Sequence, residues 1–352
     1  MERRRLLSTA VGGSLVSTIG CLDRTTNDDE TVVIPPPLED RPEHVYRPTH
    51  ASDTRTIGTS TVDEYGVGLL YSYPSRFWDL NGRTTYKQSV QEDHSVHLMA
   101  IVWDAETRAV LPEAGVTVNI LQNGDPVTEG VVYSMLSQRM GFHYGDNIDL
   151  PGDGDYTVRV SIGGMPLERT GQYEGRFTDG KTTTFELPYR REDRNELAIA
   201  TYDDSGTPGA AGRLHHDVLP ALTVPDEETL PGETLGIIEP DDAVLSVRRL
   251  RGDDAVRFDS DDYLAVVGHT PYNRMVLPIM GLRLRIERDG EVDAEEILTR
   301  TMDPELGYHY GASLPTRPGD TLRVETLTPP QTARHEGFET AFVEMSPETV
   351  EV

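Results

Sequence analysis

The sequence predicts an all-β protein with two tandem antiparallel β-sandwich domains. Three observations lead to this fold class: two stretches repeat at a constant spacing, apolar and polar residues alternate in both, and turn dipeptides follow at matching places. Alternation with a period of two indicates a half-buried strand. Short strands separated by Gly- and Pro-containing turns are typical of sandwiches in the immunoglobulin-like style.

The repeat is carried by two segments that align without a gap. Val110 to Gly145 matches Val276 to Gly311 at one constant offset. Matched anchors at one offset indicate a tandem duplication rather than a coincidence of short dipeptides. Asn123-Gly124 falls on Asp289-Gly290, and both dipeptides tolerate positive φ, so each copy is predicted to form a hairpin there.

The composition limits the classes of partner that the protein is expected to bind. The chain has 352 residues, a net charge of −28 and only two lysines, Lys87 and Lys181. An acid-rich, lysine-poor chain suits life in high salt, although an ordinary acidic protein is the alternative. Such a surface repels phosphate, so no nucleic-acid partner is expected.

The N-terminal stretch, residues 1–21, is typical of an export signal. Arg3 to Arg5 precede a short apolar run that ends just before Cys21, which is the single cysteine. The paired arginines resemble a twin-arginine signal, and Ser17 to Cys21 resembles a lipobox. A plain secretory signal with a chance cysteine is the alternative. The sequence therefore predicts an exported protein, lipidated at Cys21 and held on the outer face of the cell membrane.

The predicted order of domains follows from these features. Residues 1–21 form the signal, residues 22–58 a disordered, acidic, Pro-rich tether, and residues 59–197 the first sandwich. Residues 198–233 form an acidic connector, and residues 234–352 the second sandwich, a diverged repeat. No convincing helical pattern is found after the signal.

Histidine and methionine side chains are the candidates for chemistry. They are His94, His97, Met99, Met135, Met140 and His143 in the first copy, and His269, Met302, His309 and His335 in the second. A His/Met set suits copper, whereas imidazole with carboxylate suits iron, manganese or zinc. His97 and Met99 share one face of a strand, which fits a ligand pair or two packed side chains. His215-His216 in the connector is a weaker candidate.

Three motifs in order resemble the periplasmic ferrous-iron-transport family. They are Val96-His97-Leu98, Met135 ahead of His143-Tyr144-Gly145-Asp146-Asn147, and Gly175-Arg176-Phe177-Thr178-Asp179. The resemblance implies an immunoglobulin-like sandwich, a homodimer, and a His/Met copper site that supports iron uptake beside a membrane permease.

Carried over residue by residue, the resemblance implies His97, Met135 and His143 as metal ligands. Met99 stands in place of the family's strand glutamate and is a substitute ligand, whereas Phe177 stands where the family has histidine. Three neutral ligands favour Cu(I) over a hard ferrous ion. Met140, Met302 and His309 are weaker candidates, and Tyr263 occupies the place of His97 in the second copy.

The predicted function is a non-enzymatic, lipid-anchored protein that binds copper or iron and passes the cation to a permease. No phosphate loop, dinucleotide fingerprint or nucleophile elbow is present to suggest an enzyme. The alternative is a surface interaction or spacer module with a degenerate metal site, because fold alone does not give function.

Overall fold

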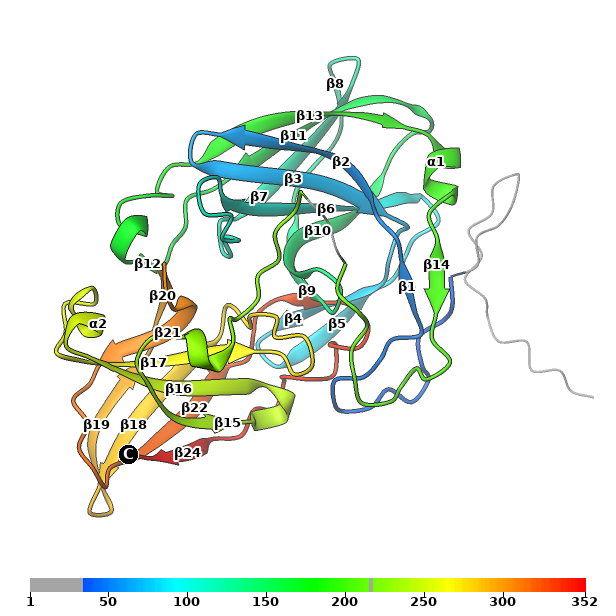
Figure 1. Cartoon of the computed structure of the whole chain (residues 1–352). Helices are drawn as coiled ribbons and strands as arrows, with labels where there is room; N and C mark the ends of the chain where they lie inside the picture. Colours follow the sequence, from blue (N-terminus) through cyan, green and yellow to red (C-terminus); the bar gives the residue numbers. More distant parts are fainter. Residues whose placement is uncertain (1–33, 215–217) are drawn as a thin grey trace, which may run out of the picture.

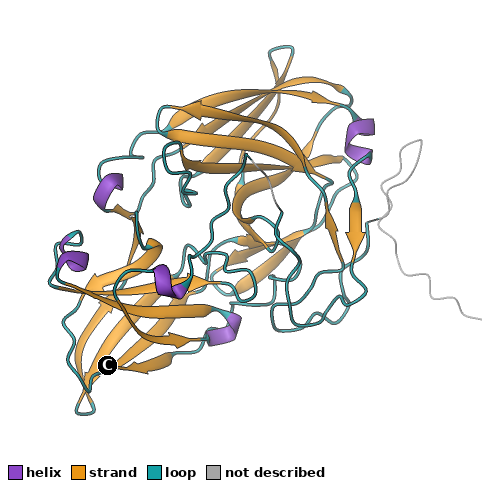
Figure 2. Ribbon diagram, in the orientation of Figure 1, coloured by secondary structure: helices purple, strands orange, loops and turns teal. Residues whose placement is uncertain are grey.

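The computed structural model describes residues 34–214 and 218–352 (Figure 1). The predicted signal, Cys21 and His215-His216 lie outside these residues. The described chain is almost entirely strands and loops (Figure 2), which confirms the predicted all-β sandwich class. Two short helices, α1 (Arg191–Asn195) and α2 (Asp253–Val256), depart from the expectation of no helix. In the described residues no helix is long and apolar enough to span a membrane.

The first sandwich pairs a large sheet with a small one. The eight-stranded sheet has the order β2 (Arg55–Val62), β3 (Tyr65–Ser72), β6 (His94–Asp104), β10 (Gly141–Asp149), β9 (Tyr133–Ser137), β23 (Ala333–Arg334), β4 (Phe77–Asn81), β5 (Thr84–Gln88). The four-stranded sheet has the order β13 (Lys181–Tyr189), β11 (Gly154–Ile162), β7 (Val116–Gln122), β8 (Asp125–Val131). Their facing sides form the core of this half (Figure 1).

The second sandwich has the same strand order. Its six-stranded sheet runs β15 (Glu233–Ile238), β16 (Val244–Arg251), β17 (Asp262–His269), β21 (Gly307–Ser313), β20 (Thr299–Asp303), β12 (Glu168–Arg169). Its four-stranded sheet runs β24 (Glu348–Glu351), β22 (Thr321–Thr328), β18 (Gly281–Arg288), β19 (Glu291–Ile297). Among the described strands, the β4–β5 hairpin has no counterpart here. The matching order agrees with a duplication, which itself stays a prediction.

Both predicted hairpins are confirmed. β7 pairs with β8 around Asn123-Gly124, and β18 pairs with β19 around Asp289-Gly290. All four turn residues have positive φ, with values of 53° and 89° in the first turn and 52° and 82° in the second. This conformation is favourable for Gly and tolerated by Asn and Asp, so the dipeptides determine the turn.

A buried tyrosine plays the same structural role in each sandwich. Tyr144 Oη accepts a hydrogen bond from Ala114 N at 2.8 Å and donates to Leu111 O at 3.2 Å. Tyr310 Oη accepts from Met280 N at 3.0 Å and donates to Leu277 O at 2.7 Å. Each hydroxyl satisfies two backbone groups that would otherwise be buried without partners.

The two sandwiches exchange short strands. β12 lies between β11 and β13 of the first sandwich in the sequence, but it pairs in parallel with β20 of the second. β23 lies between β22 and β24 of the second sandwich in the sequence, but it pairs in parallel with β9 and antiparallel with β4, both in the first. The exchange is reciprocal, as in an isologous dimer interface, yet it occurs within one chain. Each repeat therefore completes a sheet of the other.

Part of the predicted tether packs against the sandwiches in the structure, whereas the predicted domain limits stay a prediction. Residues 34–58 are ordered: Val45 and Tyr46 are fully buried, and β1 (His50–Ser52) pairs with β14 (Ile199–Thr201). The anchors are distant in sequence, since Val45 N donates to Asp242 and Thr49 N donates to Glu336. Composition alone predicted a tether because these partners cannot be inferred locally.

Candidate metal centre

Three histidines converge on the large sheet of the first sandwich. His97 lies on β6, His143 on β10, and His335 directly after β23, so the third imidazole comes from the C-terminal part of the chain. One potential ligand atom from each ring lies within 4.8 Å of the others. The structure thus brings together two of the predicted ligands, His97 and His143, with a third from the other repeat.

The strand register explains why these side chains share a face. His97 and Met99 on β6 oppose Asn147 and Gly145 on β10, and His143 opposes Met135 on β9. Alternate residues of a strand point to the same side, so all six belong to one face of the sheet. The other face carries Phe142 and Tyr144, which pack in the sandwich core. The centre therefore lies on the outer face of the large sheet.

Each of the three imidazoles has one ring nitrogen facing a hydrogen-bonding oxygen and the other free. His97 Nδ1 lies 3.0 Å from Asn147 Oδ1, His143 Nδ1 lies 3.0 Å from Gly141 O, and His335 Nδ1 lies 3.4 Å from Ser75 Oγ. All three Nε2 atoms are buried and have no hydrogen-bond partner within the described chain. The oxygens facing His97 and His143 can only accept, so these two rings have an oriented Nδ1–H and a free Nε2 lone pair, the arrangement of a metal-ligating histidine.

Burial keeps these rings neutral. Loss of hydration lowers the pKa of His97 to about 3, with a further contribution from His143, and lowers the pKa of His143 to about 4. Burial, with His97 and His143 nearby, also holds the pKa of His335 well below its usual range. Neutral imidazole is the form that binds metal, so proton competition is weak near neutral pH.

Gly145 and Met135 shape the space beside the free nitrogens. A methyl group at Gly145 would lie 3.1 Å from Met135 Sδ and 3.2 Å from His97 Nε2. The thioether and the imidazole therefore border the same gap, which glycine leaves open. Met135 is fully buried and packs against Phe77 and Ala333. Three imidazole nitrogens with a neighbouring thioether fit a soft or borderline ion such as copper.

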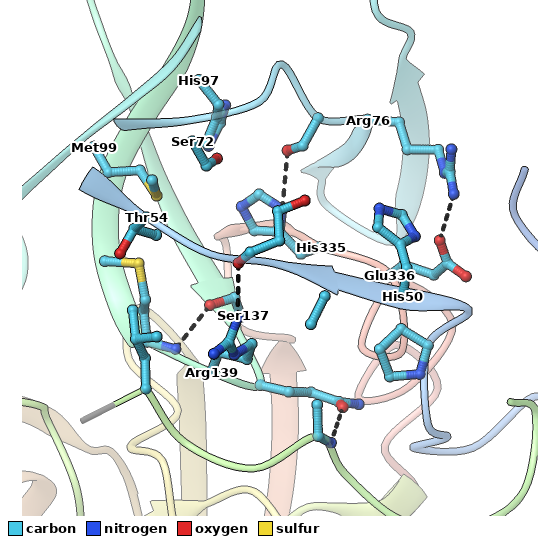
Figure 3. A pocket seen from close by; sticks show the side chains of 18 of the residues that line it. His50, Thr54, Ser72, Arg76, His97, Met99, Ser137, Arg139, His335 and Glu336 are labelled. Carbon is cyan, nitrogen blue, oxygen red and sulfur yellow. Dashed lines mark hydrogen bonds and ion pairs between the residues drawn. The ribbon is translucent and has the colours of Figure 1, made fainter. Parts of the chain in front are cut away.

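The centre opens into a cavity of about 160 Å³ (Figure 3). Met99 and Met140 line it together with His97, His143 and His335. Residues of the N-terminal segment, among them His50, form another wall, and Arg76 makes an ion pair with Glu336 at 2.9 Å (Figure 3). The predicted substitute Met99 thus borders the centre from β6.

The remaining candidates lie elsewhere. Met302 is in the hydrophobic core of the second sandwich, and His309 Nε2 lies 3.2 Å from Tyr263 Oη. His269 Nδ1 bonds to Thr270 O, and His94 Nδ1 accepts from Gln91 N. Within the described residues no second group of three His, Cys, Asp or Glu side chains comes as close.

Phe177 does not take part in the centre. It is fully buried and packs edge-on against Tyr65, with ring centroids 5.4 Å apart. The third imidazole is instead His335, which precedes Glu336-Gly337-Phe338. The sequence identified His335 as a candidate of the second copy only. Its place in the first centre depends on the strand exchange, for which the sequence gives no local signal.

Two family models match parts of the chain. Residues 88–191 match the model described as Fe2+ transport protein. That match encloses the resembling segment from Val96 to Asp179, and the family is described by transport rather than by an enzyme activity. Residues 228–351 match a domain of unknown function, DUF7350. A search of curated proteins finds no match.

Solved structures of one protein are also similar. FetP of uropathogenic Escherichia coli strain F11, as isolated, is 21% identical, with a TM-score of 0.31, over 39% of this chain and 97% of FetP. A copper-bound single-residue variant of FetP is 22% identical, with a TM-score of 0.32, over the same shares. The predicted metal ion, copper or iron, agrees with the family description and with the three-histidine donor set.

Proposed function

We propose that this protein is an exported, lipid-anchored metal-binding protein that takes part in iron or copper acquisition. His97, His143 and His335 capture the cation on the outer face of the cell, and a membrane permease receives it. The observation that carries the proposal is the group of three buried, unpartnered Nε2 atoms on histidines whose ligand atoms lie within 4.8 Å of one another. Leaving such atoms without partners is unfavourable unless a ligand satisfies them.

The donor set favours copper as the tightly held ion. Imidazole nitrogen suits Cu, Zn and Fe alike, but the thioether of Met135 beside His97 Nε2 adds a soft donor. Within the described residues, no carboxylate joins the three histidines in their cluster. Ferrous iron is bound less strongly than copper by nitrogen and sulfur donors, so it would bind more weakly at the same place. Weak binding of ferrous iron suits capture and release rather than storage.

Metal titration of the chain lacking residues 1–21 tests the proposal. In high salt and without oxygen, we expect one Cu(I) per chain, measured by competition with a chromophoric chelator, and weaker binding of Fe(II). The His143→Ala/His335→Ala variant should lose Cu(I) binding. His309→Ala is the matched control, because it removes the equivalent histidine of the second repeat, and it should bind as the wild type does.

Two results would contradict the proposal. Equal Cu(I) binding by the double variant and the wild type would place the ion elsewhere. No binding of copper, iron or manganese by the wild type would favour the alternative function, a surface interaction or spacer module. The anchor is tested separately, since Cys21→Ser should release the exported protein from the membrane fraction.

A further inference from the structure

We propose that Asn147, together with Ser75, is the positioning unit of the metal centre. Asn147 fixes the tautomer of His97 and holds the loop whose hydroxyl group faces His335. The inference rests on the proposed function, because it assigns a role in metal binding to a side chain that does not itself touch the ion. It also explains the last residue of the His-Tyr-Gly-Asp-Asn motif.

The orientation of the Asn147 amide is determined by the backbone of Ser75. Asn147 Oδ1 accepts a hydrogen bond from Ser75 N at 3.0 Å, and Asn147 Nδ2 donates to Ser75 O at 2.8 Å. The reversed amide would place its NH₂ group against an N–H and its oxygen against a carbonyl. Only one orientation therefore satisfies both bonds, and it places Oδ1 toward His97.

This orientation determines which nitrogen of His97 carries the proton. Oδ1 can only accept, and it lies 3.0 Å from His97 Nδ1, so that nitrogen must donate. The ring is neutral and carries one proton, which leaves a lone pair on Nε2. His97 Nε2 is the atom without a partner that borders the gap at Gly145. Asn147 thus presents His97 to a metal in its ligating form.

The same asparagine acts on His335 through the loop between β3 and β4. Ser75 belongs to this loop, and its Oγ lies 3.4 Å from His335 Nδ1. The two hydrogen bonds between the Asn147 amide and the Ser75 backbone fix that backbone, and hence the place from which the Ser75 hydroxyl meets the ring. One side chain on β10 therefore orients ligands from both repeats. His143 is independent, because the Gly141 carbonyl oxygen faces its Nδ1.

The experiment combines a metal affinity with a measurement of the tautomer. Nitrogen-15 NMR of the metal-free protein reports which ring nitrogen of His97 is protonated, and chelator competition reports the Cu(I) affinity. In Asn147→Ala we expect a roughly 10- to 100-fold loss of Cu(I) affinity, typical of lost outer-sphere partners, and a shift of His97 away from the Nδ1–H form. Asn147→Asp keeps the acceptor, so it should keep the tautomer.

Two more variants separate the role of Asn147 from general stability. Ser75→Ala should lower the Cu(I) affinity while leaving the His97 tautomer unchanged. Asn119→Ala is the matched control, because Asn119 bonds to Glu129 on the surface of the same sandwich, and it should change neither quantity. If Asn147→Ala does not fold, the variants Asn147→Asp and Ser75→Ala test the proposal in its place. A wild-type Cu(I) affinity in Ser75→Ala would then contradict the positioning role of Asn147 and Ser75.

The proposal is overturned if Asn147→Ala binds Cu(I) as tightly as the wild type or keeps His97 fully in the Nδ1–H form. Failure of the proposed function has a different result, since the wild type would then bind no metal. The tautomer of His97 in the metal-free protein would still test the positioning role in that case.

Discussion

In the first repeat, the gap above Gly145 is bordered by His97 Nε2 and Met135 Sδ, whereas in the second repeat the ring of Tyr263 fills the space above Gly311. A methyl group at Gly311 would lie 2.0 Å from Tyr263 Oη. Both glycines occupy the middle of equivalent strands, β10 and β21. The same backbone therefore supports an open centre in one copy and a closed core in the other.

The side chains around Gly311 explain why the space above it is closed. Tyr263 stacks on Phe258 with ring centroids 3.9 Å apart, and its hydroxyl meets His309 Nε2. Thr301 occupies the place of Met135, at the same offset as the other matched positions. Thr170, beside the exchanged strand β12, bonds to Asp303 rather than offering an imidazole. The retained histidine, His309, is thus insufficient for a metal centre, because the centre also needs a free lone pair on that histidine and other ligands beside it.

Acidification should produce the largest difference between the repeats. Burial lowers the pKa of His97 to about 3 and of His143 to about 4, and holds the pKa of His335 well below its usual range. In the second repeat burial lowers the pKa of His309 to about 4 and also lowers that of His269. The unfolded chain binds protons at these histidines below about pH 6.5, whereas the native metal-free chain binds them only at lower pH.

The contribution of these histidines to the free energy of unfolding should therefore be complete above about pH 6.5 and fall as the pH drops toward about 4. Each buried histidine contributes up to about 1.4 kcal/mol per pH unit. Denaturant unfolding between about pH 6.5 and 5 measures the proton uptake. The double variant His97→Gln/His143→Gln should reduce the proton uptake on unfolding by about two protons, and His309→Gln should reduce it by about one. An unchanged slope in the double variant would mean that His97 and His143 of the wild type are already protonated in the folded chain over this pH range.

The glycine pair should separate metal binding from stability. Gly145→Ala places a methyl group 3.1 Å from Met135 Sδ and 3.2 Å from His97 Nε2, so we expect at least a roughly tenfold loss of Cu(I) affinity. Gly311→Ala forces Tyr263 to move, and overpacking of this kind lowers the free energy of unfolding by about 1–3 kcal/mol. Chelator competition and denaturant unfolding of both variants check this. The comparison fails if Gly311→Ala weakens Cu(I) binding as much as Gly145→Ala does.

Local sequence patterns predict much of this fold. The turn dipeptides at Asn123 and Asp289 and the alternating strands before them determine both hairpins, because their conformational preferences act over short distances along the chain. His97 and Met99 could be placed on one face of a strand for the same reason, whereas His143 is joined to them only through the family resemblance. The burial of Tyr46, the exchanged strands and the arrival of His335 could not, since they depend on contacts between segments far apart in the sequence. Those contacts complete the centre.

The smallest predicted effect concerns the core-facing side of the large sheets, where both repeats carry an equivalent buried tyrosine. Tyr144→Phe leaves the N–H of Ala114 and the carbonyl of Leu111 without their partner. Tyr310→Phe does the same to Met280 and Leu277. Each change should lower the free energy of unfolding by about 1 kcal/mol, since buried backbone groups lose a hydrogen bond.

Denaturant unfolding measures this pair, with Tyr86→Phe as the control because Tyr86 is exposed. Equal losses in the two variants, with Cu(I) affinity unchanged, would show that the core face serves the same structural role in both repeats. A loss of Cu(I) affinity in Tyr144→Phe would instead mean that the tyrosine also holds the histidine face of β10. The difference between the two repeats would then involve both faces of the sheet, because His143 and Tyr144 are neighbours on opposite faces of one strand.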